Sequence, residues 1–149
     1  MITYRISKAQ AEEFFRNEIL FEDSRIDGYT LDDMVRILTG DSFKFICSGI
    51  GDTIIAVTAF KKVREDLGAE VHTFVLPLYR KYAVEALKSH IKYLGHCRIP
   101  HLYTTCSNYN MKVMNFLIKR LGFYVYNSFE VPETRDGEPV ILYNLCKVV

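Results

Sequence analysis

The segment 75–85 places a proline and two basic residues at the expected start of a helix. An apolar run ends at Leu76, Pro77 follows, and Arg80 and Lys81 come just before a helical pattern begins. Backbone N–H groups at a helix start have no partner within the helix and carry partial positive charge. A turn of this composition is typical of a site that binds an anion such as a phosphate group.

Two titratable residues precede this turn on the same expected strand. Glu70 and His72 are separated by one residue, and alternate residues of a strand point to the same face. Histidine titrates near neutral pH and a carboxylate accepts protons, so either residue suits a general base. The alternative interpretation is a strand histidine whose ring is satisfied by a neighbouring side chain.

The elements that must hold these residues follow from the spacing of the apolar side chains. Strands are predicted over 2–6, 43–49, 53–63, 69–76, 101–106, 123–131 and 139–149, and helices over 11–20, 31–39, 79–94 and 107–122. A polar link at 64–68 joins two of the strands. The helix between strands 69–76 and 101–106 implies that these strands are parallel and close together. We therefore expect an α/β fold with a mixed, mostly antiparallel sheet and helices on both faces.

Local signals set the ends of several elements. Ser7, with Gln10 three residues later, predicts a capping box, and Thr30 predicts a cap for the next helix. The GIGD turn at 49–52 and the Asp136-Gly137 pair predict hairpins. The helical spacing predicts that the following side chains are buried: Ala11, Phe14, Phe15, Ile19, Val113, Met114, Leu117 and Leu121. His90, beside an apolar stripe, is interpreted as a structural residue.

The composition is typical of one folded domain over residues 1–149. Hydrophobic residues make up 49% and charged residues 25%, and the net charge of +1 gives no indication of nucleic-acid binding. No apolar run approaches the roughly 20 residues that span a bilayer, and the first ten residues lack a signal-peptide core. The scattered cysteines are interpreted as reduced thiols rather than a disulfide or metal framework. We expect a cytoplasmic protein without a metal or membrane partner.

The element order resembles that of the GNAT N-acetyltransferases over nearly the whole chain. In that family a strand ends in V-x-P-x-x-R and continues into x-x-G-x-G/A, and here residues 75–80 read VLPLYR and residues 81–85 read KYAVE. A second family signature is an asparagine near the start of a later helix that ends in L-G-F. Asn108 and Asn110 lie near such a start, and L-G-F stands at 121–123.

The resemblance implies acetyl-CoA as cofactor and an amine of a small molecule or protein as acceptor. The cofactor contacts it implies are the backbone of Phe74, Val75 and Leu76 for the pantetheine arm, and Arg80, Lys81, Tyr82, Ala83, Asn108 and Lys112 around the phosphates. Glu70 or His72 is the implied base. Tyr109 is the expected proton donor, with Tyr103 and Cys106 as alternatives. Helix capping is the alternative for both asparagines.

Three positions depart from the family pattern. Ala83 replaces a glycine, Glu85 places a carboxylate where glycine or alanine is usual, and Ile118 stands where many members carry a catalytic tyrosine. Two unit charges about 4 Å apart repel by roughly 1 kcal/mol in water and roughly 4 at an effective dielectric of 20. Glu85 therefore weakens the phosphate site unless it points away.

A second hypothesis is a non-catalytic role. The segments 71–87 and 110–123 are also similar to compact GNAT-like proteins of tailed bacteriophages, some of which are associated with virion or head assembly. On that interpretation the protein acts through contacts with virion proteins in the host cytoplasm. Phe123, Tyr124 and Tyr126 on the closing strands are then an exposed apolar interaction surface. A homodimer that pairs through these closing strands is a further alternative.

Overall fold

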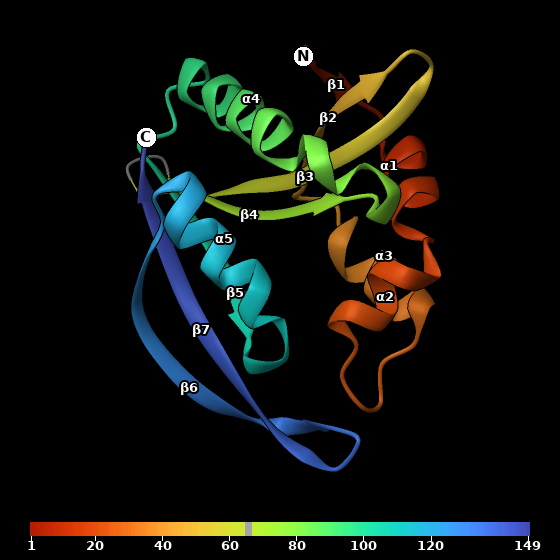
Figure 1. Cartoon of the computed structure of the whole chain (residues 1–149), viewed down its shortest axis with the longest axis vertical. Helices are drawn as coiled ribbons and strands as arrows, with labels where there is room; N and C mark the ends of the chain where they lie inside the picture. The colour runs from red at the N-terminus through yellow and green to blue at the C-terminus, as the bar shows by residue number, and fades with distance from the viewer. Residues whose placement is uncertain (65–66) are drawn as a thin grey trace.

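A seven-stranded sheet in the order β1-β2-β3-β4-β5-β7-β6 forms the centre of the computed structural model, which describes residues 1–64 and 67–149 (Figure 1). The strands are β1 Thr3–Ile6, β2 Lys44–Ile50, β3 Thr53–Arg64, β4 Gly68–Val75, β5 His101–Ser107, β6 Tyr124–Arg135 and β7 Glu138–Val148. The helices are α1 Lys8–Phe15, α2 Glu18–Ser24, α3 Leu31–Leu38, α4 Ala83–His96 and α5 Met111–Leu121, with 3-10 turns η1 Pro77–Tyr82 and η2 Asn108–Asn110.

Among the described strands only β4 and β5 pair in parallel, and the other neighbours are antiparallel. This confirms the expected mixed, mostly antiparallel sheet and the crossover from β4 to β5 through α4. Both hairpin turns are also as expected, with positive φ at Gly51 and at Asp136 and Gly137. Residues 65 and 66 of the expected polar link at 64–68 lie outside the described residues.

The sheet separates two apolar cores. On one face α1, α2 and α3 pack against β2, β3 and the end of β4, in a cluster that contains Phe15, Val57 and Phe74. On the other face α4 and α5 pack against the same sheet, in a cluster that contains Val71 and Leu145. Each large side chain buried in this way contributes about 1.5–3 kcal/mol. Helices therefore cover both faces, as the sequence predicts.

The first predicted helix, 11–20, is wrong in one respect, because the chain forms two helices here. α1 ends at Phe15, and Asn17 caps α2, since its side chain accepts hydrogen bonds from the N–H groups of Ile19 (3.0 Å) and Leu20 (3.1 Å). The restart rotates the helix, so Leu20 is buried and Ile19 is 56% exposed. The capping box at Ser7 and the cap at Thr30 are confirmed, and Asp33 completes a capping box at Thr30 as well.

The helix predicted over 31–39 is confirmed as α3, whereas α4 and α5 begin later than expected. Residues 77–82 form a 3-10 turn before α4, and residues 108–110 form another before α5. In α5, Val113 is 49% exposed, which contradicts its predicted burial. Strand β6 continues past 131 because Pro132 falls in a pairing irregularity, where a missing N–H costs no ladder bond.

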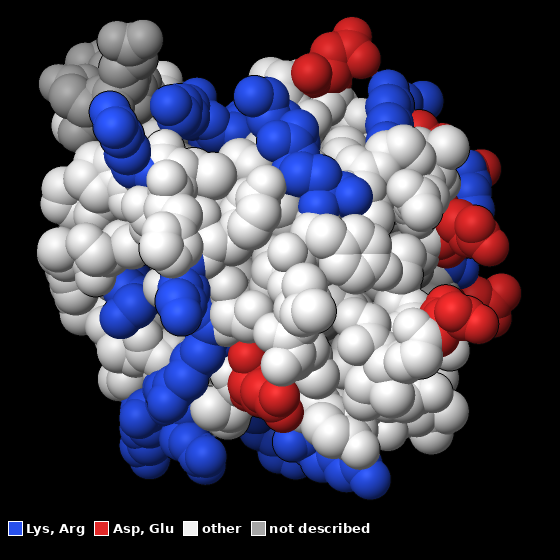
Figure 2. All heavy atoms as spheres, turned by 90° about the horizontal axis from the view of Figure 1, so that it is seen from above, with Lys and Arg blue, Asp and Glu red and all other residues white. Residues whose placement is uncertain are grey.

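Charge divides between the two helical layers. The segment 77–129, which carries α4 and α5, has eight basic residues and one acidic residue, Glu85. The segment 7–39, which carries α1–α3, has eight acidic and four basic residues. Figure 2 shows many basic side chains across the left and centre of this surface, and most of the acidic ones toward the right. No helix among the described residues is long and apolar enough to cross a membrane.

Candidate functional site

Strands β4 and β5 separate soon after they begin to pair. Their register joins Ala69 to Leu102 and Glu70 to Tyr103, and β4 then continues to Val75 paired with β3 alone. The divergence is visible where β4 and β5 leave one another in Figure 1. The edge of β4 that faces β5 therefore offers unpaired backbone groups beyond Glu70.

Alternation along β4 decides which backbone groups face this opening. The N–H of Leu76 donates to the carbonyl of Ile55 on β3, at 2.8 Å. In an antiparallel ladder successive residues turn their N–H and C=O groups to opposite sides. The backbone of Phe74 is therefore also directed to β3, while Thr73 and Val75 face the opening. Of the three residues expected to contact pantetheine, only Val75 has backbone groups that face the opening. Thr73 was not predicted, because its orientation follows from the strand register.

Glu70 and His72 contact one another on the α1–α3 face. His72 Nε2 lies 3.0 Å from Glu70 Oε2, and Lys61 Nζ lies 3.7 Å from the same oxygen. The hydrogen bond from His72, followed by the charges of His72 and Lys61, lowers the pKa of Glu70 against the opposing effect of burial. The ring of Phe43 stands edge-on to His72, with centroids 5.7 Å apart. The imidazole is thus oriented by a carboxylate at the mouth of the opening, an arrangement suited to proton transfer.

The turn before α4 is partly closed by its own hydrogen bonds. The N–H of Tyr79 donates to Leu76 at 2.9 Å, and the N–H of Ala83 donates to the carbonyl of Arg80. No side chain caps the start of α4 at Tyr82, so its next N–H groups keep no side-chain acceptor. Tyr82 itself packs partly buried against the core below α4.

The charged residues of this turn are held by neighbours. Arg80 donates to Asp23 of α2 at 2.7 Å, and Lys81 Nζ lies 5.1 Å from the centre of the Tyr82 ring. Glu85 Oε1 lies 3.3 Å from the amino group of Met1, so this carboxylate turns toward β1. The repulsion expected from Glu85 is reduced accordingly. Lys112 is exposed at the start of α5.

Asn108 and Tyr109 contact β7. Asn108 Oδ1 accepts from the N–H of Ile141 at 2.9 Å, and the Tyr109 hydroxyl donates to the carbonyl of Pro139 at 3.3 Å. The capping interpretation of the asparagines is wrong, because Ser107 caps η2 and Asn110 makes no capping bond. Neither Asn108 nor Tyr109 is brought to Glu70 and His72.

Among the candidate proton donors, Tyr103 lies nearest the opening in the sheet register, directly opposite Glu70. Burial, and then the neighbouring Cys146 and Tyr126, raise the pKa of Tyr103, so its hydroxyl keeps its proton. Cys106 is buried on the α4–α5 face, and burial raises its pKa to about 11. Ile118 is 37% exposed.

His90 has a structural place under α4, as expected, although it is fully rather than partly buried. Its Nε2 lies 2.7 Å from Ser48 Oγ and its Nδ1 lies 2.7 Å from Thr58 Oγ1. Burial lowers the pKa of His90 to about 4, so the ring is neutral and bridges two strands.

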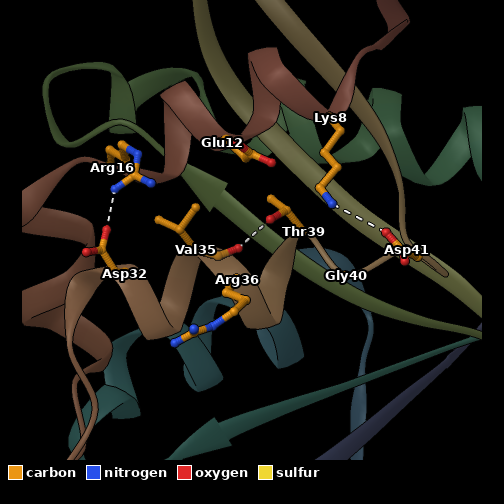
Figure 3. Close-up of a pocket in the computed structure, with 9 residues that line it drawn as sticks. All are labelled: Lys8, Glu12, Arg16, Asp32, Val35, Arg36, Thr39, Gly40 and Asp41. Carbon is orange, nitrogen blue, oxygen red and sulfur yellow. Dashed lines mark hydrogen bonds and ion pairs between the residues drawn. The ribbon is translucent and has the colours of Figure 1, made fainter.

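A separate hollow of about 630 Å³ lies between α1 and α3 (Figure 3). Four of its charged side chains are paired with one another, since Arg16 contacts Asp32 at 2.6 Å and Lys8 contacts Asp41 at 3.4 Å. The Thr39 hydroxyl is bonded within its own helix. Nothing in this hollow adds a reactive group.

The cysteines and acidic residues form no second site in the described parts of the chain. All four cysteines are free thiols, and no group of three or more His, Cys, Asp or Glu residues among 1–64 and 67–149 is placed to hold a metal ion.

Comparison with known proteins gives a fold but no family. Neither the protein-family models nor the curated proteins contain a match to the chain. Spermidine N-acetyltransferase SpeG from Vibrio cholerae matches with a TM-score of 0.75 and 9% identity, over 99% of this chain and 95% of that one. A GNAT-family acetyltransferase from Streptococcus pneumoniae matches with a TM-score of 0.71 and 15% identity, over 99% of both chains. The protein yncA from Salmonella typhimurium, solved with its cofactor acetyl-CoA, matches with a TM-score of 0.71 and 16% identity, over 99% of this chain and 93% of that one. The chain has the fold of the GNAT N-acetyltransferases.

Proposed function

We propose that this protein is an acetyl-CoA-dependent N-acetyltransferase that acts on an amine in the cytoplasm. The observation that carries the proposal is the open edge of β4 beyond Glu70. Thr73 and Val75 there offer backbone groups to which the amide groups of a pantetheine arm bind as an added strand. Four residue steps lead from His72 to Leu76, about 13 Å of strand, which suits an extended arm between the thioester and the phosphates.

The surrounding charge fits the same ligand. Bound acetyl-CoA supplies an activated acetyl group on a thioester and several negative phosphate charges. The basic layer of α4 and α5 attracts such an anion, and the uncapped start of α4 with Lys81 stands at the end of the opening. Glu85, turned toward β1, leaves that place accessible.

The dyad on the α1–α3 face supplies the proton chemistry. The acceptor reacts as its free amine, after its ammonium form has released one proton to water. As the nitrogen attacks, it gives a second proton to His72, which Glu70 orients and whose positive charge it stabilises. The amine nitrogen forms a bond to the acetyl carbonyl carbon, and the bond from that carbon to sulfur breaks. Tyr103, opposite Glu70, gives a proton to the leaving thiolate. The match to a spermidine N-acetyltransferase supports an amine as the acceptor.

Hydrogen exchange with and without acetyl-CoA tests the proposal. The amides of Thr73 and Val75 should exchange fast in the free protein and become protected when acetyl-CoA binds. Those of Phe74 and Leu76, directed to β3, should be protected in both states. Calorimetry should give micromolar binding. Absence of binding at millimolar acetyl-CoA, or protection without this two-residue alternation, would contradict the proposal.

A role in bacteriophage virion assembly is the second candidate, favoured by the exposed rings of Tyr124 (51%) and Tyr126 (50%). Phe123 is 5% exposed, so the prediction that it belongs to this surface is wrong. Mass spectrometry of virions from a phage that encodes the chain would detect the protein. Replacing both tyrosines by serine should remove it from the particle.

A further inference from the structure

A row of side chains crosses the sheet from the proposed base to its outer edge. The register places Lys61 opposite Glu70, Glu70 opposite Tyr103, Tyr103 opposite Cys146, and Cys146 opposite Tyr124. Side chains opposite one another in a sheet share a face. The row therefore continues the line of Glu70 across β5, β7 and β6.

This row lies on the α1–α3 side of the sheet. Leu102 and Leu145, next to Tyr103 and Cys146 in sequence, are buried in the core under α4 and α5. Because neighbouring residues of a strand point to opposite faces, Tyr103 and Cys146 point the other way. The core that α1–α3 form draws on β2, β3 and Phe74. The tyrosines of β5 and β6 stand on the remaining, uncovered part of this face.

The tyrosines form an aromatic surface beside one carboxylate. The rings of Tyr103 and Tyr126 meet edge to face, with centroids 6.3 Å apart and planes at 82°. Tyr124 and Tyr126 are half exposed. The hairpin that carries them is fixed at its far end, where Arg25 contacts Asp136 at 2.8 Å. The aromatic surface is thus held in place relative to α2.

Charge and length indicate what this surface holds. A carboxylate with adjacent aromatic faces attracts an ammonium group. Glu70 shares its carboxylate with Lys61 and His72, and the row contains no other carboxylate, so the row accommodates no more than one further positive charge. From Glu70 on β4 to Tyr124 on β6 the row crosses three strand-to-strand spacings, about 14 Å in all. This distance leaves room for an apolar body attached to that ammonium. The acidic α1–α3 layer draws a cation to this face.

We infer that the acceptor is a monocationic primary amine carried on a flat apolar or aromatic body, with its ammonium at Glu70 and its body on Tyr103, Tyr124 and Tyr126. The inference rests on the proposed function and names its substrate class. It distinguishes this chain from an enzyme for polyamines, whose further ammonium groups would meet no carboxylate in the row.

Acetyl transfer to a matched set of amines tests the inference. Thiol release from acetyl-CoA should be at least tenfold more efficient with phenethylamine than with ethylamine or spermidine. Tyr126→Ser should raise KM for phenethylamine about tenfold and leave KM for ethylamine and the Kd for acetyl-CoA unchanged. Phe129→Ser is the control, because Phe129 is also on β6 and equally exposed at 48%. Tyr126→Lys should weaken the binding of phenethylamine further, because the introduced lysine repels the ammonium group of the substrate.

Each contrary outcome has a distinct meaning. Preference for spermidine or ethylamine, or equal effects of the Tyr126 and Phe129 variants, would overturn the substrate class and leave the proposed function standing. A dimer in solution that buries Tyr126 would also overturn it. If acetyl-CoA does not bind at all, the proposed function fails and the inference fails with it. Saturation-transfer NMR with phenethylamine gives a binding readout that does not depend on turnover.

Discussion

His72 Nε2 and Glu70 Oε2 lie 3.0 Å apart on β4, at the point where β5 leaves that strand. We predict that His72→Asn lowers kcat/KM for acetyl transfer about 100-fold, because general base catalysis typically contributes at least that factor. Glu70→Gln should cost about tenfold, since His72 loses the carboxylate that orients its ring. The measurement is the pH–rate profile of each variant. Glu130→Gln, exposed on β6, is the control and should match the wild type.

The charges at the start of α4 should set the affinity for acetyl-CoA. Lys81→Ala should weaken binding about three- to tenfold, whereas Lys92→Ala, later on α4, should have little effect. Glu85→Gln should strengthen binding about two- to fivefold, because removing an exposed charge relieves about 1 kcal/mol of repulsion or less. Calorimetric titration measures all three. Weaker binding by Glu85→Gln would show that its contact with Met1 supports the turn.

Burial of neutral His90 makes stability depend on pH. Its pKa falls from 6.5 to about 4 in the folded protein, so the unfolded chain binds the proton first as pH drops. The contribution to stability is complete above about pH 6.5, is lost as pH falls toward 4, and amounts to about 3 kcal/mol. In His90→Gln the free energy of unfolding should decline less between pH 7 and 4. Urea titrations measure this, with His96→Gln, exposed in the last turn of α4, as control. An equal decline in His90→Gln would contradict the prediction.

Asp27 fixes the tip of the β6–β7 hairpin. Its carboxylate accepts from the N–H groups of Asp136 (2.9 Å) and Gly137 (3.0 Å) and from the Thr134 hydroxyl (2.7 Å). These bonds, the Gly137 one foremost, lower the pKa of Asp27. The anchor is therefore present above the ordinary pKa of an aspartate and weakens only as pH falls through the lowered value.

Asp27→Ala should speed hydrogen exchange at the amides of Asp136 and Gly137 and lower Tm by a few degrees. Asp52→Ala, in the β2–β3 turn, should leave those amides unchanged. The same exchange rates in Asp27→Ala and wild type would show that Arg25 and Arg135 hold the hairpin without Asp27.

Local sequence was enough wherever neighbouring residues decide the structure. The capping boxes at Ser7 and Thr30, the helix end at Gly122 with its left-handed φ of 79°, and the Asp136-Gly137 turn all depend on residues a few positions apart. Hydrophobic spacing gave the order of strands and helices, and that order indicated the fold. The helix break at Asn17 was not predicted, because the apolar spacing continues across it. The break depends on one side chain, that of Asn17, which caps a new helix.

Tertiary structure alone decided how the candidate site is arranged. The register puts Glu70 opposite Tyr103 and determines that Thr73 and Val75, not Leu76, face the opening. Arg80 turns to Asp23, and Asn108 and Tyr109 turn to β7, through contacts between residues 30 or more positions apart. Sequence by itself determined that a strand with Glu70 and His72 leads into a basic helix start. Which side chains meet there depended on packing and strand register, because these contacts form between segments whose alignment no local pattern encodes.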